Sequence, residues 1–155
     1  MTRTRLIFFP LLWSLLGCSM LPSARADDPL DALQARVIDV SQRVTPSVVH
    51  IEAAVKQNNR RNLVTGSGVL TDPNGLVLTN EHVVERAEKV SVVVPGRDGR
   101  YAAQIIGTDK QTDLAVLRIS RREGEPAFPA ATLGDSDALR VGEWVGRLPP
   151  GCYSR

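Results

Sequence analysis

Six short β-rich runs, with turn-forming words between them, most constrain the fold of this 155-residue chain. Apolar and β-branched residues dominate each run, as in strands that bury one face. No long helical pattern separates the runs, so they favour a closed or nearly closed antiparallel barrel and an all-β fold class. The predicted strands are SVVHIEAAV, GSGVL, GLVLT, KVSVVV, YAAQIIG and DLAVLRI, and the turn words are QNNRRN, DPNG and PGRDG.

The first 26 residues have the composition of an export signal. Arg3 and Arg5 precede LIFFPLLWSLLG, an apolar core too short to span a bilayer as a permanent helix. The word SARA offers cleavage after Ala26, whereas LLGC resembles a bacterial lipobox and would make Cys18 a lipid-anchored N-terminus. Both interpretations place the protein outside the cytoplasm, in the periplasm or on a membrane as a lipoprotein.

Charge and cysteine content exclude several classes of partner. The sequence pI of about 8.8 reflects the leader, which holds three arginines and no acid, while the remaining residues hold 16 basic and 17 acidic side chains. A nucleic-acid partner is therefore not expected. Cys18 and Cys152 are the only cysteines, so we expect no intramolecular disulfide, no cysteine–histidine metal set and no cofactor.

The N-terminal helix is expected to begin at Asp28-Pro29, an N-cap followed by a first-turn proline, and to end at Thr45-Pro46. Its apolar stripe is expected to serve packing or oligomer contact. The stripe consists of Leu30, Leu33, Val37, Val40 and Val44. The expected segments are a signal peptide at 1–26 (or a lipoprotein signal at 1–17), the helix at 27–46, the barrel at 47–120, a connector at 121–145 and an aberrant tail at 146–155.

His82 lies where the apolar alternation of GLVLT ends, at the start of the single helical turn predicted in EHVVERA. Asp113 follows 31 residues later, between a polar turn and the last apolar strand. A buried aspartate that accepts a hydrogen bond from one imidazole nitrogen fixes the tautomer and leaves the other nitrogen free to take a proton. The two residues therefore fit the base and orienting half of a Ser-His-Asp triad, although this spacing alone is weak evidence.

Three sequence motifs carry a family resemblance: GSGVLTDPNGLVLTNEHVV, TDLAVLRI and LGDSDALRVGEWV. In order and spacing they resemble the protease domain of the HtrA/Deg family, exported trypsin-like quality-control proteases, over roughly residues 46–145. The resemblance implies that these residues form the first of two barrels, and that the family acts on unfolded or misfolded polypeptides and assembles trimers. It implies that His82 is the general base and Asp113 its orienting aspartate.

The same resemblance assigns roles to four neighbours of these residues. Gly66 and Gly68 match a glycine pair that lets one strand pass close to others, and Thr79 and Asn80 match the lead into the histidine turn. The word VGEWV at 141–145 predicts the first strand of a second barrel.

No residue of the chain matches the family's nucleophile, which lies in a G-N-S-G-G word. Ser67 in TGSGV matches a structural strand, and Ser136 in LGDSDAL lacks the glycine pair. We therefore expect the chain as given to be truncated before the nucleophile and inactive. From Gly146 the word GRLPPGCYSR departs from the family with two adjacent prolines that a central strand would not tolerate. This predicts a frameshift or truncation near codon 146, with G-N-S-G-G encoded downstream in another frame.

Several alternatives remain open. His82 and Asp113 could be structural turn residues, and His50 within VVHIE is best interpreted as structural. A zinc site on His82 and Glu85 has helical-turn spacing but no evident third ligand. The alternative function is a non-catalytic pseudo-protease fragment that binds unfolded chains through exposed strand edges.

Overall fold

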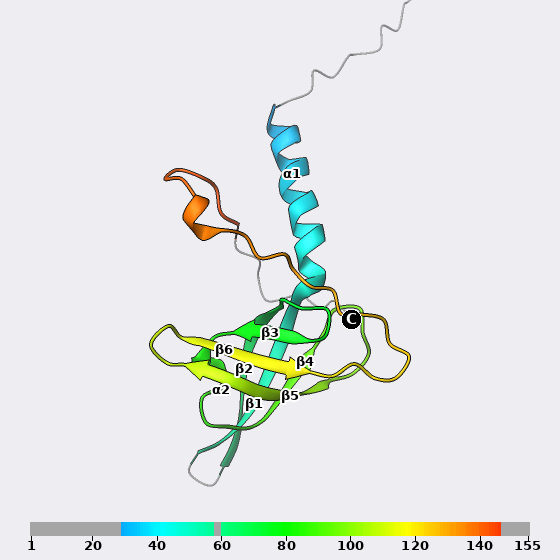
Figure 1. The fold of residues 1–155 in the computed structure, drawn as a ribbon, viewed down its shortest axis with the longest axis vertical. Coiled ribbons are helices and arrows are strands. Elements are labelled where there is room, and N and C mark those ends of the chain that lie inside the picture. Colours follow the sequence, from blue (N-terminus) through cyan, green and yellow to red (C-terminus); the bar gives the residue numbers. More distant parts are fainter. Residues whose placement is uncertain (1–28, 58–59, 147–155) are drawn as a thin grey trace, which may run out of the picture.

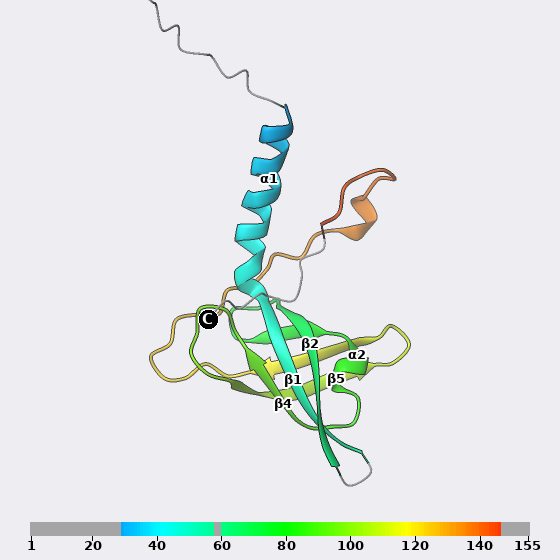
Figure 2. The same ribbon diagram turned by 180° about the vertical axis from the view of Figure 1, so that it is seen from behind.

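The computed structural model of the chain describes residues 29–57 and 60–146. The predicted export signal, the two cysteines, the predicted N-cap Asp28 and all but the first residue of the predicted aberrant tail lie outside these residues. The described part is a barrel from which one long helix, α1 (Pro29–Val44), stands away, as both ribbon views show (Figures 1 and 2). A 3-10 turn over Thr45–Ser47 joins the helix to the barrel.

Six antiparallel strands close the barrel in the order β1-β2-β3-β6-β5-β4. Closure leaves no unpaired edge, which explains how such short strands form a stable sheet. The strands are β1 (Val48–Gln57), β2 (Arg60–Leu70), β3 (Leu76–Thr79), β4 (Ala87–Val93), β5 (Tyr101–Asp109) and β6 (Leu114–Ile119). The predicted all-β barrel is confirmed, and each predicted run contributes one strand.

The barrel interior is filled by the inward-facing half of each strand. On β1, Val49, Ile51 and Ala53 are fully buried, while His50 and Glu52 between them are partly exposed. This period of two is the one predicted from the sequence. The remaining core residues are Leu70, Val77, Val83, Val84, Val90, Val92, Val94, Tyr101, Ala115, Leu117, Ile119 and Phe128.

The predicted turn QNNRRN is shorter in the structure, and β2 begins six residues before the predicted GSGVL. Lys56 pairs with Arg61, and Gln57 with Arg60, so the β1–β2 ladder continues almost to the tip of the hairpin. The sequence prediction failed here because these residues carry polar side chains on both faces. Backbone pairing in the hairpin, rather than burial, determines their conformation.

Helix α1 buries none of its residues. The exposed apolar side chains include Leu33 at 38%, Val37 at 53% and Val40 at 52% relative exposure, so the predicted stripe faces solvent. Among the described residues, no helix is long and apolar enough to cross a membrane.

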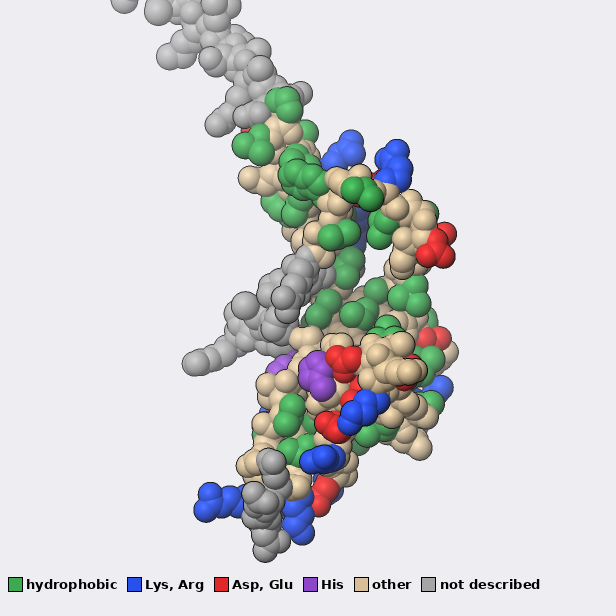
Figure 3. Space-filling view, turned by 90° about the vertical axis from the view of Figure 1, so that its left-hand side faces the viewer, with side chains coloured by type: hydrophobic (Ala, Val, Ile, Leu, Met, Phe, Trp, Pro, Cys, Tyr) green, Lys and Arg blue, Asp and Glu red, His purple; other side chains and the backbone are tan. Residues whose placement is uncertain are grey.

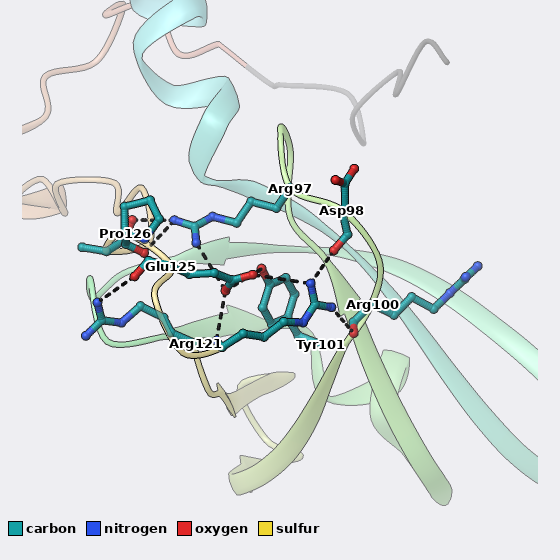
Figure 4. A network of polar contacts seen from close by, with 9 residues as sticks. Arg97, Asp98, Arg100, Tyr101, Arg121, Glu125 and Pro126 are labelled. Carbon is teal, nitrogen blue, oxygen red and sulfur yellow. Dashed lines mark hydrogen bonds and ion pairs between the residues drawn. The ribbon is translucent and has the colours of Figure 1, made fainter.

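The segment after β6 packs against the β4–β5 connection and the start of β5. The five residues that make these contacts, which we call the clasp, are Arg97, Tyr101, Arg122, Glu125 and Phe128. The Tyr101 and Phe128 rings meet edge to face with centroids 5.4 Å apart. The Tyr101 hydroxyl donates to both Glu125 oxygens at 2.9 Å (Figure 4). Arg97 lies over the Phe128 ring and Arg122 over the Tyr101 ring, at 4.8 and 4.6 Å from the centroids. Burial and the bond to Glu125 raise the pKa of Tyr101.

The predicted strand VGEWV does not form. Residues 141–142 make a turn, 143–146 have no regular structure, and Val141 and Trp144 are exposed at 110% and 82%. A strand needs a neighbour to accept and donate its backbone hydrogen bonds. The described part of the chain offers this segment none, so the prediction is wrong for this structure.

Candidate active site

The histidine predicted to be catalytic sits on α2 (Glu81–Val84), a single helical turn between β3 and β4. Val83 and Val84 of this turn are buried in the core, and His82 therefore faces outward. A Cβ placed on Gly66 would lie 2.6 Å from both γ-carbons of Val83. The glycine thus leaves the space in which α2 packs against β2, as the glycine pair predicts.

Gly68, the second member of that pair, fills a similar role deeper in the barrel. A Cβ at this position would lie 2.7 Å from Val77 Cγ1 and 2.9 Å from Ile51 Cδ1. Close approach of β2 to its neighbours therefore requires glycine at both positions.

His82 and Asp113 are in direct contact. The His82 Nδ1 atom lies 2.8 Å from Asp113 Oδ2 and 3.0 Å from Oδ1. An ionised carboxylate can only accept hydrogen bonds, so Nδ1 carries the proton and Nε2 is left with a free lone pair. Nε2 makes no hydrogen bond within the described residues.

The site is open to solvent. The side chain of His82 is 66% exposed and that of Asp113 is 44% exposed, and a surface view of this side of the molecule shows histidine next to acidic side chains (Figure 3). The aspartate of such a pair is expected to be buried, whereas Asp113 is partly exposed, so this expectation is wrong. Asp113 lies in the turn just before β6 rather than within the strand, and its side chain is therefore not enclosed by the barrel.

Asp113 is held by more than the imidazole. Its carboxylate Oδ1 accepts the backbone N–H of His82 at 3.0 Å, and its backbone carbonyl accepts the N–H of Glu81 at 3.2 Å. The backbone of Asp113 has a φ of 53°, in the left-handed region that is unusual for residues other than glycine. Hydrogen bonds to the His82 N–H, and then to its ring, hold the pKa of Asp113 below its usual value despite an opposing effect of burial.

Asn80 also contacts this aspartate, which the sequence did not predict. Its Nδ2 atom lies 3.1 Å from Asp113 Oδ2 and 3.2 Å from the Asp113 backbone oxygen. In the sequence, Asn80 stands out only as part of the motif before the histidine. The available signal was that motif itself, since an amide two residues from a histidine can reach the same partner.

The other candidate residues lie away from this contact or are engaged elsewhere. His50 is paired within β1 against Ser67 and Val93, in keeping with a structural role. Ser136 is exposed in the 3-10 turn Ser136–Ala138. The Glu85 carboxylate accepts a hydrogen bond from Lys110 at 2.9 Å, and among the described residues no three potential ligands gather around a metal site.

Comparison with known proteins agrees with this geometry. The profile of the trypsin-like peptidase domain matches residues 66–149, which include both His82 and Asp113. The chain is 36% identical over 117 residues to a probable periplasmic serine endoprotease DegP-like of Pseudomonas savastanoi pv. phaseolicola. It is 46% identical over 92 residues to a putative serine protease HhoA of Synechocystis.

The chain belongs to the HtrA/Deg family of trypsin-like serine proteases. The matches cover 75% and 59% of the chain, but the chain spans only 23% and 22% of the length of these two relatives. A third HtrA/Deg relative, the DegP-like protein of Chlamydia muridarum, is 43% identical over 55% of the chain and 16% of its own length. The family assignment therefore rests on the barrel and on the sequence motifs around His82 and Asp113.

Proposed function

We propose that His82 and Asp113 are the general base and the orienting aspartate of an HtrA-like serine endopeptidase that hydrolyses peptide bonds of unfolded proteins. The observation that carries this proposal is the 2.8 Å contact between His82 Nδ1 and Asp113 Oδ2, which leaves Nε2 unoccupied among the described residues. In a serine peptidase the free Nε2 accepts the proton of the serine hydroxyl and later returns it to the leaving amine. The aspartate stabilises the imidazolium formed between those two steps.

For the pair to act, a serine and an oxyanion hole have to be supplied from outside these 155 residues, because none of the chain's serines lies in a G-x-S-G-G word. A groove beside the site supports such an arrangement. Its lining includes Ser67, Leu78, Asn80 and Leu114, and Leu114 is 43% exposed. An exposed apolar surface next to a proton acceptor is suited to packing against the part of a protease that carries the nucleophile.

The proposal is tested by supplying that part. A chimera is made in which the 117 residues of this chain that align with the Pseudomonas relative replace their counterparts in it. We expect the remaining length of that relative, a probable serine endoprotease, to supply the nucleophile. We expect the chimera to cleave an unfolded protein, and the chain alone to show no cleavage and no labelling by a serine-directed phosphonate. Asp113→Asn should lower the chimera's turnover by about 10⁴-fold.

A chimera that stays inactive although it folds would contradict the proposal and favour the non-catalytic alternative. Labelling of Ser67 or Ser136 in the chain alone would contradict it as well. His50→Asn serves as the matched control, because His50 lies in the barrel wall and should leave turnover unchanged.

We also propose that the protein acts outside the cytoplasm. The proposal is supported by the export-signal composition of residues 1–26 and by the DegP-like relatives, which are described as periplasmic. Mass spectrometry of the mature protein should find Asp27 at the N-terminus, or a diacylglyceryl group on Cys18. An intact Met1 on cytoplasmic protein would contradict export.

Self-association through α1 is a third proposal. It is supported by the spacing of the exposed apolar stripe, in which Leu33, Val37 and Val40 recur every three or four residues. Val37→Asp should weaken any trimer detected by analytical ultracentrifugation, whereas Gln42→Asp, outside the stripe, should not. A chain that sediments as a monomer at every concentration would contradict this proposal.

A further inference from the structure

Asn80 occupies the N-cap position of α2 without acting as an N-cap. An asparagine at this position normally accepts a hydrogen bond from the second or third backbone N–H of the helix through its side-chain oxygen. The Asn80 side chain makes no such bond. The N–H that it would cap, that of His82, is instead bound by Asp113 Oδ1 at 3.0 Å.

The exchange leaves the Asn80 amide free to act as a donor. Its Nδ2 group bridges the carboxylate Oδ2 and the backbone oxygen of Asp113, at 3.1 and 3.2 Å. Side chain and main chain of the aspartate are thereby tied together by one planar group. Because the Asp113 backbone is in the left-handed region, with a φ of 53°, such a tie opposes its relaxation to a more common conformation.

The two carboxylate oxygens consequently have separate anchors. Oδ1 is held by the His82 backbone N–H and Oδ2 by Asn80, and the His82 ring nitrogen lies between them at 3.0 and 2.8 Å. The short turn that carries the imidazole thus also carries both donors that fix the plane of the aspartate. Rotation of the carboxylate away from the imidazole would break a bond at either oxygen.

We propose that Asn80 is a positioning residue that holds Asp113 in the orientation needed to keep His82 in its Nδ1–H tautomer. The inference rests on the proposed function of the His82–Asp113 pair. It assigns the role to the donor group of Asn80. An aspartate or serine at this position, although a good N-cap, would therefore not replace it.

The test separates this role from helix capping, because the two predict opposite effects of one substitution. Asn80→Asp keeps the size and capping ability of the residue but replaces the donor with a second carboxylate beside Asp113. If Asn80 only supports the helix, Asn80→Asp is neutral or stabilising. If Asn80 positions Asp113, the substitution repels the aspartate and releases the imidazole.

The readout is the ¹⁵N NMR spectrum of the histidine rings in the full chain at neutral pH, which distinguishes the Nδ1–H from the Nε2–H tautomer. We expect His82 in the wild-type chain to be mainly Nδ1–H. Asn80→Asp and Asn80→Ala should each lower the ratio of Nδ1–H to Nε2–H by about fivefold, the effect of one ordinary hydrogen bond. Asp113→Asn should change it at least as much, and His50 should keep its wild-type spectrum throughout.

The outcomes are distinct. If Asp113→Asn changes the His82 tautomer and both Asn80 variants leave it unchanged, the inference on Asn80 is wrong and the proposed pair stands. If Asp113→Asn itself has no effect, the proposed pair fails and the inference fails with it. Should Asn80→Asp not fold, the Asn80→Ala spectrum decides alone.

Discussion

The two ends of β6 hold two carboxylates in similar hydrogen-bond networks that have different consequences. Asp113 precedes the strand and Glu125 follows it in the clasp, and the pKa of each is lowered first by a backbone N–H, from His82 and Arg122 respectively. At Glu125 the hydrogen-bond donors are Tyr101 and Arg122, and Arg97 adds an ion pair at 3.5 Å. The Glu125 side chain is 21% exposed. At Asp113 one donor is the His82 ring, whose second nitrogen, Nε2, faces solvent.

Under the proposed function, an anchored carboxylate closes the structure at one end of β6 and orients a reactive group at the other. The clasp buries its two aromatic rings, since Tyr101 and Phe128 are each 3% exposed. The site directs its imidazole outward, with 66% of the side chain exposed. Stability should therefore depend on the clasp, and chemistry on the site.

Phe128→Ala should have the largest effect on stability. The ring is buried against Tyr101 and under Arg97, so its loss should lower the free energy of unfolding by about 3–5 kcal/mol. His82→Ala, at the exposed end, should change it by no more than about 0.5 kcal/mol. Urea unfolding monitored by far-UV circular dichroism measures the free energy of unfolding of both variants. Equal losses would show that the two ends do not differ as described.

Gly66→Ala should produce the next largest effect, at the site end. The new methyl group would collide with Val83, which should cost about 1–3 kcal/mol and displace α2 with His82. Adding Val83→Ala should relieve part of this cost, so the two substitutions should be clearly non-additive in a double-mutant cycle. Gly134→Ala is the control, since a Cβ there meets no atom within 4 Å. Additive costs would contradict the proposed contact.

The smallest expected effects are in the acid stability of the two networks. Both carboxyl groups have lowered folded-state pKa values, so each stabilises the fold above about pH 4 and loses that contribution as the pH falls through its folded-state pKa. Glu125→Gln and Asp113→Asn should therefore each flatten the decline in stability between about pH 5 and pH 2. The flattening should be larger for Glu125, which is less exposed.

Urea midpoints measured across that pH range test this expectation, with Glu123→Gln as the control for an exposed carboxyl group. Variant and wild-type curves that remain parallel down to pH 2 would show that neither carboxylate is linked to folding. If Asp113→Asn flattened the decline more than Glu125→Gln, the expectation that the less exposed carboxylate contributes more to stability would be wrong.

Much of the barrel could be predicted from the sequence, because alternating burial leaves a direct trace in residues such as Val49, Ile51 and Ala53. The pairing of His82 with Asp113 could be predicted from the motifs shared with the family, but not from the spacing of the two residues in the sequence. The hairpin tip, by contrast, depends on backbone pairing between Lys56 and Arg61, which polar side chains do not reveal. The hydrogen bonds from Tyr101 to Glu125 and from Asn80 to Asp113 join residues 24 and 33 positions apart, so their partners could not be identified from the sequence.

The most direct test of the central claim, that His82 is a general base oriented by Asp113, is the rate at which a fluorophosphonate labels the active serine of the chimera with the Pseudomonas relative. Labelling reports proton transfer from the serine without requiring a peptide to bind. The account predicts that His82→Ala lowers this rate by about 10⁴-fold or more, while His50→Ala leaves it unchanged. Equal labelling rates for the two histidine variants would contradict it.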